Sequence, residues 1–596
     1  MPTLLVIGGA SLDTIHLSGH TVESAGGAGV YTALAARRSG AQASLFGPRP
    51  DPVPQVLQPV AERLTSWLGP VVKPKDLPRF QIVHQGGGSS YLEALYGAEQ
   101  ELTPASLPPD LSVYDWIHIV SLGSVQRQLG FLRACRRRGA RRISVGTWLD
   151  SLVKTPEAVR DVIEQTDISF MNEREAVALF GSTETASTGP GKLMFVKRGQ
   201  RGALVLQGSF ATEVEGVPSA TLDPTGAGNA FCGATLAFLM QGEHPIMAAR
   251  RAMPLAAEMA EHVGPEALLW PEAPPPMLLD VRVVANVSQV QRLAPFVASL
   301  RELAPFSFAG ANYPPAGHPV ALACFFAASL QQFGFWTAAE GRYDHPLIAP
   351  IEGGQLKGSD YLWRAFMRRL DGDAEFYGPR RQAGLTRQEM LDLFRADDGS
   401  DPMPALDLHL EMARQYGRDM LALGLTPEEV IRRAMASPSP LATFLRTLDQ
   451  VGGYKEDPLR KKSALLAMIL SQRPETYLTF GVNERLPPVI DYHLMRAALR
   501  TGLIDVVDEN LYRDLADRRL LSTSDEWAVR SATYRAIEQV AALSGRDSGS
   551  VDNWFFFNSR NRCPEMTEPD CARCPVDPLC SHRKELFQPV LRTTFY

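Results

Sequence analysis

Short runs of apolar, β-branched residues alternate with helical patterns over the first part of the chain. The apolar runs include WIHIVSL (116–122), ISFMN (168–172) and ALVLQG (203–208), with longer segments of helical periodicity between them. This alternation is typical of a parallel sheet whose strands are joined by crossover helices. The pattern therefore predicts an α/β domain over residues 1–275.

A proline-rich stretch separates this region from a second one. PEAPPPM occupies 271–277, and helical spacing dominates later segments such as LDLHLEMARQYGRDMLALGL (406–425) and SDEWAVRSATYRAIEQVAALSG (524–545). Apolar residues at this spacing predict amphipathic helices, and the proline cluster predicts a linker. We expect a domain boundary near residue 275 and a mostly α-helical domain over 285–596.

The composition is that of a globular chain without a strong charge imbalance. Of the 596 residues, 45% are hydrophobic and 21% are charged, and the formal net charge is -6. This balance disfavours a protein that coats nucleic acid through its overall field. The first residues, MPTLLVIGGASLD, contain neither a basic leader nor a signal-type hydrophobic stretch, and no apolar run reaches membrane-spanning length. We expect a cytoplasmic protein with small-molecule ligands and no membrane contact.

Glycines and small residues precede an apolar helical run in LDPTGAGNAFCGATLAFLMQG (222–242). Backbone N–H groups at such a helix start can hold an anion. Together with SLD (11–13), AGGAGVYTALAARRSGAQASLFG (25–47), NERE (172–175) and VKRGQRGALV (196–205), this segment resembles the PfkB, or ribokinase-like, family of sugar and nucleoside kinases. The resemblance implies a ribokinase-like fold, a nucleoside- or sugar-sized pocket, a nucleotide or Mg²⁺ as further ligands, and a homodimer formed through this domain.

The same resemblance implies the residues of the pocket and a defect in it. They are Asp13, Gly26, Gly27, Asn172 and Glu175, with an anion site at Gly226, Ala227 and Gly228. The family's glycine motif ends in an aspartate that takes the proton of the attacking hydroxyl, but this sequence has Asn229 there. Loss of a positioned base costs about 10²–10⁴-fold in rate. We therefore expect a kinase-inactive domain; the alternative is that Asn229 is tolerated and another residue acts as base.

Four of the seven cysteines lie close together near the end of the chain. Cys563, Cys571, Cys574 and Cys580 are separated by seven, two and five residues. Four thiolates at this spacing can enclose one metal centre, and their separation from the isolated cysteines argues against a disulfide framework. The loop at 563–580 resembles the iron–sulfur loop of endonuclease III and MutY-type glycosylases. That resemblance implies a [4Fe–4S] cluster, with Zn²⁺ as the alternative.

Asp491 is the candidate catalytic residue. LPPVIDYHLMRAALRTGLID (486–505) resembles the segment of the same helix-hairpin-helix superfamily in which a catalytic aspartate opens a helix. A carboxylate there stabilises the positive charge that develops on the sugar when a C1′–N bond breaks. The alternative role of Asp491 is an ordinary helix N-cap.

From about 290 onward the chain is also similar to the queuosine 5′-phosphate N-glycosidases of queuosine salvage. The matching segments include SLQQFGFWTAAEG (329–341), GSDYLWRAFMRRLDGD (358–373), LTRQEMLDLFRADDG (385–399) and the closing VLRTTFY. The resemblance implies a hydrolase that releases the base of a queuosine-like 7-deazaguanine nucleoside or of its 5′-phosphate. The cysteine loop and His493, which stands where arginine is usual, depart from this family.

Several further residues are candidate contacts for such a substrate. Phe335, Trp336 and Tyr361 are expected to stack on the base and Asp397 or Asp398 to accept its N–H groups, with Lys462 and His493 as further contacts. Lys462 also lies near the position of the Schiff-base lysine of bifunctional glycosylases. Core packing and ordinary solvated charges are the alternative explanations for these residues.

Four functions stay open on the sequence alone. The first is an N-glycosidase joined to a nucleoside-binding, kinase-like domain. The second is an iron–sulfur DNA glycosylase, which the acidic balance and the missing glycine-rich hairpin in GGYKEDPLRKK (452–462) disfavour. The third is a PfkB-type nucleoside or sugar kinase, and the fourth is a nucleoside-binding regulator without enzymatic activity.

Overall fold

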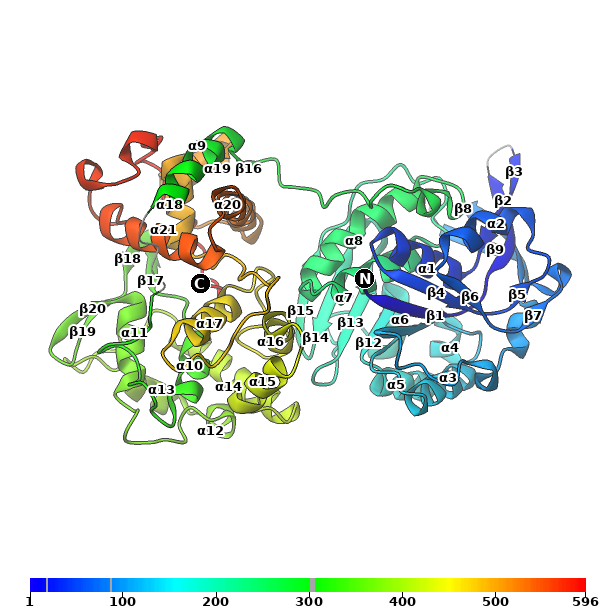
Figure 1. The fold of residues 1–596 in the computed structure, drawn as a ribbon, viewed down its shortest axis with the longest axis horizontal. Helices are drawn as coiled ribbons and strands as arrows, with labels where there is room; N and C mark the ends of the chain where they lie inside the picture. Colours follow the sequence, from blue (N-terminus) through cyan, green and yellow to red (C-terminus); the bar gives the residue numbers. More distant parts are fainter. Residues whose placement is uncertain (18–19, 86–87, 301–305) are drawn as a thin grey trace. The chain divides into compact units, whose positions relative to one another are not determined.

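The computed structural model describes residues 1–17, 20–85, 88–300 and 306–596. Two compact units are present, Met1–Leu278 and Leu279–Tyr596 (Figure 1). The prolines at 274–276 lie immediately before the division between them.

A nine-stranded sheet organises the first unit. Its strand order is β15, β14, β13, β12, β11, β10, β1, β4 and β6, and neighbouring strands run parallel from β6 to β13, whereas β14 and β15 are antiparallel. The strands are β1 Thr3–Ile7, β4 Gln42–Phe46, β6 Ser66–Leu68, β10 Trp116–Ile119, β11 Ile143–Gly146, β12 Ile168–Asn172, β13 Leu193–Lys197, β14 Ala203–Gln207 and β15 Phe210–Val214. The predicted α/β domain with a parallel sheet is confirmed.

Helices flank this sheet, and the closest approach is between α1 and α7. The helices are α1 Ala28–Arg38, α2 Gln58–Arg63, α3 Val125–Arg137, α4 Leu149–Lys154, α5 Pro156–Gln165, α6 Glu173–Phe180, α7 Ala227–Met240 and α8 Pro245–Ala260. A Cβ at Gly233 of α7 would come within 2.0 Å of the Thr32 carbonyl oxygen of α1. Only glycine permits this contact, so the backbones of α1 and α7 pack closely at Gly233.

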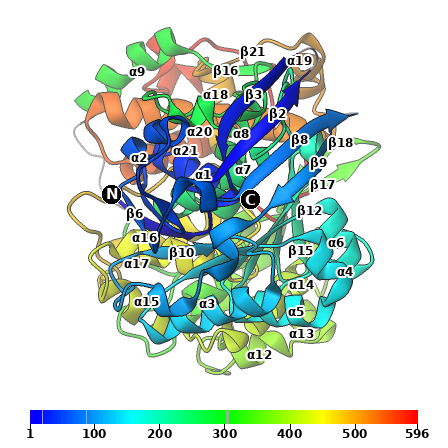
Figure 2. The ribbon, with the colours of Figure 1, turned by 90° about the vertical axis from the view of Figure 1, so that its right-hand side faces the viewer.

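A second, smaller sheet carries the residues that precede the first glycine-rich motif. It has the order β3, β2, β8, β9 (Figure 2), formed by β2 Ser11–Leu17, β3 His20–Gly26, β8 Arg79–Gln85 and β9 Gly88–Leu95. The strands β5 Arg49–Pro50 and β7 Val71–Val72 form a separate short pair. Since β2 and β3 are antiparallel neighbours, the motifs at 11–13 and 24–27 lie side by side.

The second unit is mostly helical, as the sequence predicts. Its helices are α9 Val287–Ser299, α10 Ala321–Ser329, α11 Gly358–Met367, α12 Pro379–Ala383, α13 Arg387–Phe394, α14 Leu406–Ala422, α15 Pro427–Met435, α16 Pro440–Leu448, α17 Lys461–Gln472, α18 Tyr492–Thr501, α19 Glu509–Ala516, α20 Thr523–Ser544 and α21 Ser548–Arg562. Short strand pairs join β16 Val283–Ala285 to β21 Ile504–Val506, β17 Trp336–Ala339 to β18 Arg342–Pro346, and β19 Ile348–Ile351 to β20 Gly354–Lys357. A glycosylase-like type for this helical unit stays a prediction.

Two neighbouring helices of this unit position its candidate residues. Helix α18 begins after Asp491 and ends at Gly502, whose left-handed φ of 77° stops the helix. Helix α21 packs beside α18 and ends at Cys563, the first cysteine of the loop (Figure 1). Among the described helices, none is long and apolar enough to cross a membrane.

Candidate functional site

In the first unit, Asp13 on β2 lies beside the glycines that the sequence predicts to line a pocket, and its pKa is far from the usual value. A Cβ at Gly26 would come within 1.7 Å of Asp13 Oδ2, so only glycine leaves room for this carboxyl group. Asp13 is 3% exposed, and its Oδ1 has no hydrogen-bond partner among the described residues. Burial raises the pKa of Asp13 to about 7; a contact with Ser11 acts against this shift and the charge of Asp223 adds to it. A buried, unpaired carboxyl group of this kind can accept the hydroxyl groups of a sugar.

Gly27 begins α1 beside the same carboxyl group. It has a φ of 100°, and a Cβ there would meet the Gly9 carbonyl oxygen at 2.5 Å. The Gly27 carbonyl accepts the N–H of Tyr31, at 3.2 Å. The Tyr31 ring in turn lies against Gly226, where a Cβ would be 2.5 Å from it. Tyr31 therefore links the Asp13 region to the start of α7.

Gly226, Ala227 and Gly228 form the start of α7, which the sequence predicts to be an anion site. Gly226 is the N-cap residue in a left-handed conformation, with a φ of 84°. A Cβ at Gly228 would lie 3.2 Å from Lys197 Nζ, so the ammonium group at the end of β13 faces this turn. A helix N-terminus and an ammonium group together favour bound phosphate. The sequence analysis did not single out Lys197, because only the fold brings β13 to α7.

A cleft of about 390 Å³ opens beside this turn. Lys197, Gly228, Phe231, Met253 and Ala257 are among the residues that line it. Its size is within the range of small-molecule pockets, and its walls are mostly apolar, with an ammonium group at one side. The cleft can therefore accommodate a nucleotide whose phosphates reach the start of α7.

Asn229 occupies the third position of α7 and is half-buried. Its backbone N–H donates to the Gly226 carbonyl at 2.9 Å. The nearby carboxylate of Asp223 is already engaged, because it accepts the N–H groups of Thr225 at 2.9 Å and Gly264 at 2.8 Å. Its Oδ1 also lies 3.0 Å from His84 Nε2. Asp223 therefore holds the glycine turn in place and is poorly placed to replace the missing base.

Asn172 and Glu175 form a capping box at the start of α6. Asn172 Oδ1 accepts the Glu175 N–H at 2.9 Å, and Glu175 Oε2 accepts the Asn172 N–H at 2.8 Å. The Thr147 hydroxyl also donates to Glu175 Oε2, at 2.8 Å. Burial raises the pKa of Glu175, although Lys197 acts in the opposite direction. Both predicted pocket residues thus stabilise a helix start, and Lys197 connects it electrostatically to the turn of α7.

The second unit contains a cavity of about 140 Å³ that includes Asp491. Its aromatic lining comes from Phe306, Phe308, Tyr313, Phe335, Trp363, Tyr492, Phe556 and Phe557, and its charged or polar lining includes Lys357, Asp360, Lys461, Asp491, His493, Asp552, Asn553 and Arg560. Aromatic walls with a few convergent polar groups are typical of a site for a flat, polar ligand.

Asp491 is both the N-cap of α18 and part of the cavity wall. Its Oδ1 accepts the N–H groups of His493 at 2.8 Å and Leu494 at 3.0 Å. Burial raises the pKa of Asp491, while the ammonium group of Lys461 and the two N–H groups oppose that rise. The capping role is what these contacts show; a role in chemistry stays a prediction.

Two further titratable residues, Lys461 and Asp552, lie near Asp491. Lys461 Nζ donates to the Gln332 carbonyl at 2.9 Å, and burial lowers its pKa to about 8. Asp552 Oδ1 accepts the Val489 N–H at 3.0 Å, and burial together with the charge of Asp491 raises its pKa well above the usual range. A protonated Asp552 beside Asp491 gives the cavity both a hydrogen-bond donor and an acceptor. The sequence analysis missed Asp552, because only the packing of α21 beside α18 brings this residue close to Asp491.

Two of the three aromatic residues predicted to stack on a base lie away from the cavity. Phe335 lines it, but Trp336 points into a separate cluster with Phe587. Tyr361 is fully buried, and its hydroxyl donates to the Phe394 carbonyl at 2.8 Å. For Trp336 and Tyr361 the alternative of core packing applies, since among the described residues neither is part of the cavity wall.

Asp397 and Lys462 are also engaged elsewhere. Asp397 stabilises a turn by accepting the Gly353 N–H at 2.8 Å. Lys462 is 1% exposed, and its ammonium group donates to the Leu330 carbonyl at 3.1 Å. Neither residue is among the described ones that line the cavity. The helical register explains the difference, because the preceding lysine, Lys461, takes the position facing the ligand space.

The cysteine loop follows the end of α21, whose C-cap residue is Cys563. All four cysteines are free thiols, and the pKa of Cys580 is raised by burial and by the proximity of Cys563, Cys574 and Cys571. Donors already point at the sulfurs: Arg500 Nη1 lies 3.3 Å from Cys563 Sγ, Asn558 Nδ2 3.5 Å from Cys574 Sγ, and the His582 N–H 3.3 Å from Cys580 Sγ. Such donors commonly support metal-bound thiolates. The donor set fits a four-thiolate metal centre.

One feature of this loop keeps zinc open as the occupant. Ligand atoms of Cys571, Asp577 and His582 all lie within 4.8 Å of one another. Nitrogen, oxygen and sulfur ligands together are common at zinc sites, whereas iron–sulfur clusters are held mainly by thiolates. The structure thus offers two overlapping ligand sets on the same loop.

Comparisons with known proteins concern the first unit. The model of the pfkB family carbohydrate kinases matches residues 95–272. The cytidine kinase of Thermococcus kodakarensis is 27% identical over 256 residues, which cover 41% of this chain and 90% of that protein. Two solved nucleoside kinases, from Burkholderia thailandensis in complex with inosine and from Methanocaldococcus jannaschii, are 18% and 19% identical. Each covers 44% of this chain and 93% of its own, with TM-scores of 0.38 and 0.37.

The first unit therefore carries a kinase-like domain similar to the PfkB family, and this part of the prediction is confirmed. The predicted enzyme class, a hydrolase of N-glycosyl bonds, is wrong: the matched relatives are kinases, which transfer a phosphoryl group. The similarity of the second unit to queuosine salvage enzymes and to iron–sulfur glycosylases stays a prediction.

Proposed function

We propose that the first unit is a nucleoside kinase-type phosphotransferase domain that binds a nucleoside beside Asp13 and a nucleotide, with Mg²⁺, at the start of α7. The observation that carries the proposal is the Asp13 carboxyl group, which is buried over Gly26 and has an oxygen without a partner among the described residues. An unpaired buried carboxyl group is costly unless a ligand completes its hydrogen bonds. The ribose hydroxyls of a nucleoside are donors of the required kind.

The phosphate side of this proposal rests on Lys197 and Gly228. Both line the cleft, and the ammonium group faces the first turn of α7. The attacking hydroxyl would lie near Asn229, whose amide does not take up a proton as a carboxylate does. We therefore expect the domain to bind both ligands but to transfer phosphate slowly.

Calorimetry with cytidine, inosine and a non-hydrolysable ATP analogue tests the binding, and a radiolabelled phosphate assay tests the transfer. The Asp13→Asn variant is expected to lose nucleoside affinity by about tenfold or more while nucleotide affinity is unchanged. Glu23→Gln, on β3 of the same small sheet but exposed, is the matched control. If the Asp13→Asn variant binds nucleosides as tightly as the wild-type protein, the proposed site is wrong.

For the second unit, we propose a binding site for a nucleoside 5′-monophosphate with a flat, purine-like base of the 7-deazaguanine class. The aromatic wall, including Phe335 and Phe556, suits stacking, and Asp552 and Asn553 offer hydrogen bonds to a base edge. Lys357 and Arg560 supply positive charge at the same cavity. A 5′-monophosphate is also the kind of product that a nucleoside kinase makes, so the two units would handle related ligands.

Titration of queuosine 5′-monophosphate, with queuosine and guanosine 5′-monophosphate as comparisons, tests this second site. Phe556→Ala should weaken binding by about 1–3 kcal/mol through loss of stacking. Trp336→Ala is the matched control, because that ring packs away from the cavity. If none of the three ligands binds, the site is assigned wrongly.

We also propose that Cys563, Cys571, Cys574 and Cys580 hold a [4Fe–4S] cluster, with Zn²⁺ as the alternative. Either centre would crosslink the loop through thiolate bonds and stabilise its fold. Anaerobic purification followed by metal analysis and visible absorption distinguishes the two. Four iron atoms with a broad absorption favour the cluster, one zinc atom without colour favours zinc, and a protein free of both metals would overturn the proposal.

A further inference from the structure

We infer that Glu565, within the cysteine loop, is a positioning residue that couples the metal centre to the wall of the Asp491 cavity. The inference rests on the proposed metal centre and on the proposed ligand site. It assigns to the loop a second role: holding a buried carboxylate between two cations of the cavity region.

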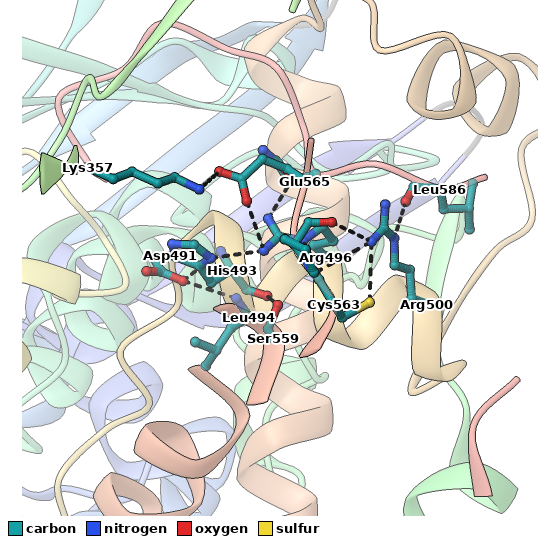
Figure 3. A network of polar contacts seen from close by, with 12 residues as sticks. Lys357, Asp491, His493, Leu494, Arg496, Arg500, Ser559, Cys563, Glu565 and Leu586 are labelled. Atoms are coloured by element: carbon teal, nitrogen blue, oxygen red, sulfur yellow. Dashed lines mark hydrogen bonds and ion pairs between the residues drawn. The ribbon is translucent and has the colours of Figure 1, made fainter. Parts of the chain in front are cut away.

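Glu565 lies two positions after Cys563 and points into the protein. It is 2% exposed, although Met566 and Glu568 beside it are exposed. Glu565 Oε1 forms an ion pair with Lys357, a residue of the cavity wall. Glu565 Oε2 lies 3.4 Å from Arg496 Nη2 (Figure 3).

Arg496 carries this contact to the cavity. Its guanidinium group is fully buried, and Nη2 also lies 3.0 Å from His493 Nδ1. Burial and the charge of Arg496 lower the pKa of His493 well below its usual value, so the imidazole is neutral and accepts a hydrogen bond from Arg496. His493 lines the cavity, and its backbone N–H donates to Asp491 Oδ1. Figure 3 shows this continuous row of contacts from Lys357 through Glu565 and Arg496 to His493 and Asp491.

The other side of the same guanidinium group is attached to the cysteine loop itself. Arg496 Nε donates to the Cys563 carbonyl at 3.0 Å. One turn later on α18, Arg500 donates to Cys563 Sγ at 3.3 Å and to the Pro564 carbonyl at 3.1 Å. The two arginines therefore hold residues 563–565 by three kinds of contact: with the Cys563 sulfur, with backbone carbonyl groups and with the Glu565 carboxylate.

This arrangement would make the cavity depend on metal loading although the cavity contains no metal ligand. Without a metal centre the thiols are no longer tied together, and only the contacts with Arg496 and Arg500 would hold residues 563–565 against α18. Lys357 and Arg496 would then face each other near the cavity without the carboxylate between them. Arg496 is fully buried, and a buried cation without its carboxylate partner is unfavourable, so the wall around His493 would rearrange.

The test compares full-length, metal-loaded variants with wild-type protein depleted of metal by a chelator. Glu565→Gln removes the charge but leaves all four cysteines, and Glu565→Asp keeps the charge while shortening its reach. Glu568→Gln, an exposed carboxylate on the same loop, is the matched control. Three readouts are taken: metal content, hydrogen exchange of residues 491–496, and affinity for queuosine 5′-monophosphate.

We expect Glu565→Gln to retain wild-type metal content, to exchange faster over 491–496 and to bind the ligand about tenfold or more weakly. Metal-depleted wild type should show the same two losses, Glu565→Asp smaller ones and Glu568→Gln none. Exchange at 491–496 needs no ligand, so a failed ligand proposal leaves this readout intact. Two results would overturn the inference. In the first, both metal-loaded Glu565 variants show the hydrogen-exchange rate of loaded wild type over 491–496. In the second, metal-depleted wild type shows that same rate.

Discussion

Asp457 and Arg530 form a two-armed ion pair in the interior of the second unit, with oxygen–nitrogen distances of 2.7 and 2.8 Å. Both side chains are at most 1% exposed. Asp457 also accepts the Lys461 N–H at 2.7 Å, so the pair fixes the start of α17 and thereby the lysine that faces Asp491. Arg530 lies under the ring of Tyr596, at 5.2 Å. Arg530 thus contacts both Asp457, before α17, and the ring of Tyr596.

We predict that Asp457→Asn destabilises the second unit by about 3 kcal/mol, because Arg530 loses its two-armed partner and keeps only the longer ion pair with Glu526, at 3.8 Å. Urea unfolding of the full chain, followed by hydrogen exchange in peptides from α20, measures the loss. Asp407→Asn, which breaks an exposed pair with Arg387, should cost about 1 kcal/mol or less. Equal effects of the two variants would contradict the importance assigned to the buried pair.

The pH dependence of nucleoside binding should report Asp13. Its pKa in the folded protein is about 7, so the carboxyl group loses its proton as the pH rises through 7 and becomes a better acceptor for ribose hydroxyls. Affinity for cytidine is therefore expected to rise between about pH 6 and pH 8. Calorimetry across this range should show the rise in wild type and not in Asp13→Asn.

Glu99 requires a separate control in that experiment. Burial raises its pKa to about 7 as well, and its carboxylate accepts the Gly9 N–H at 3.2 Å. Glu99→Gln should keep the pH dependence of binding if Asp13 is responsible. A flat profile in Glu99→Gln would assign the effect to Glu99 instead.

Asn229→Asp should increase phosphate transfer. A carboxylate at this position of α7 supplies the missing proton acceptor, for which about 10²–10⁴-fold in rate is the usual gain. Initial rates with cytidine and Mg²⁺–ATP measure it, and Asn229→Ala is the control that removes the amide without adding a base. No gain in Asn229→Asp, with both ligands bound, would mean that other parts of the transfer site are also incomplete.

Asp552 should make the second unit less stable at alkaline pH. Its pKa is raised well above the unfolded value, so the folded protein holds a proton that the unfolded chain has lost. The free energy of unfolding therefore falls as the pH rises above about 4, by up to about 1.4 kcal/mol per pH unit for one proton. Asp552→Asn removes this contribution, and unfolding series at several pH values should show a shallower decline than in wild type or in Asp407→Asn.

The alternation of apolar runs determined the parallel sheet of the first unit, because strand and helix periodicities are local properties of the sequence. The glycine motifs were also informative, because at Gly26 and Gly226 a side chain would collide with Asp13 and Tyr31, so glycine is required there. Asp491 was found as a residue that opens a helix, and the structure shows it there as the N-cap of α18.

Only the tertiary structure decided which side chains share a cavity. Trp336 and Phe335 are adjacent in sequence but enter different clusters, and Lys461, not Lys462, faces Asp491. Lys197, Asp552 and Glu565 gave no sequence signal, because their roles depend on strands and helices that meet from distant parts of the chain. Periodicity and local motifs fix which elements form, whereas the contacts of buried charges depend on how those elements pack.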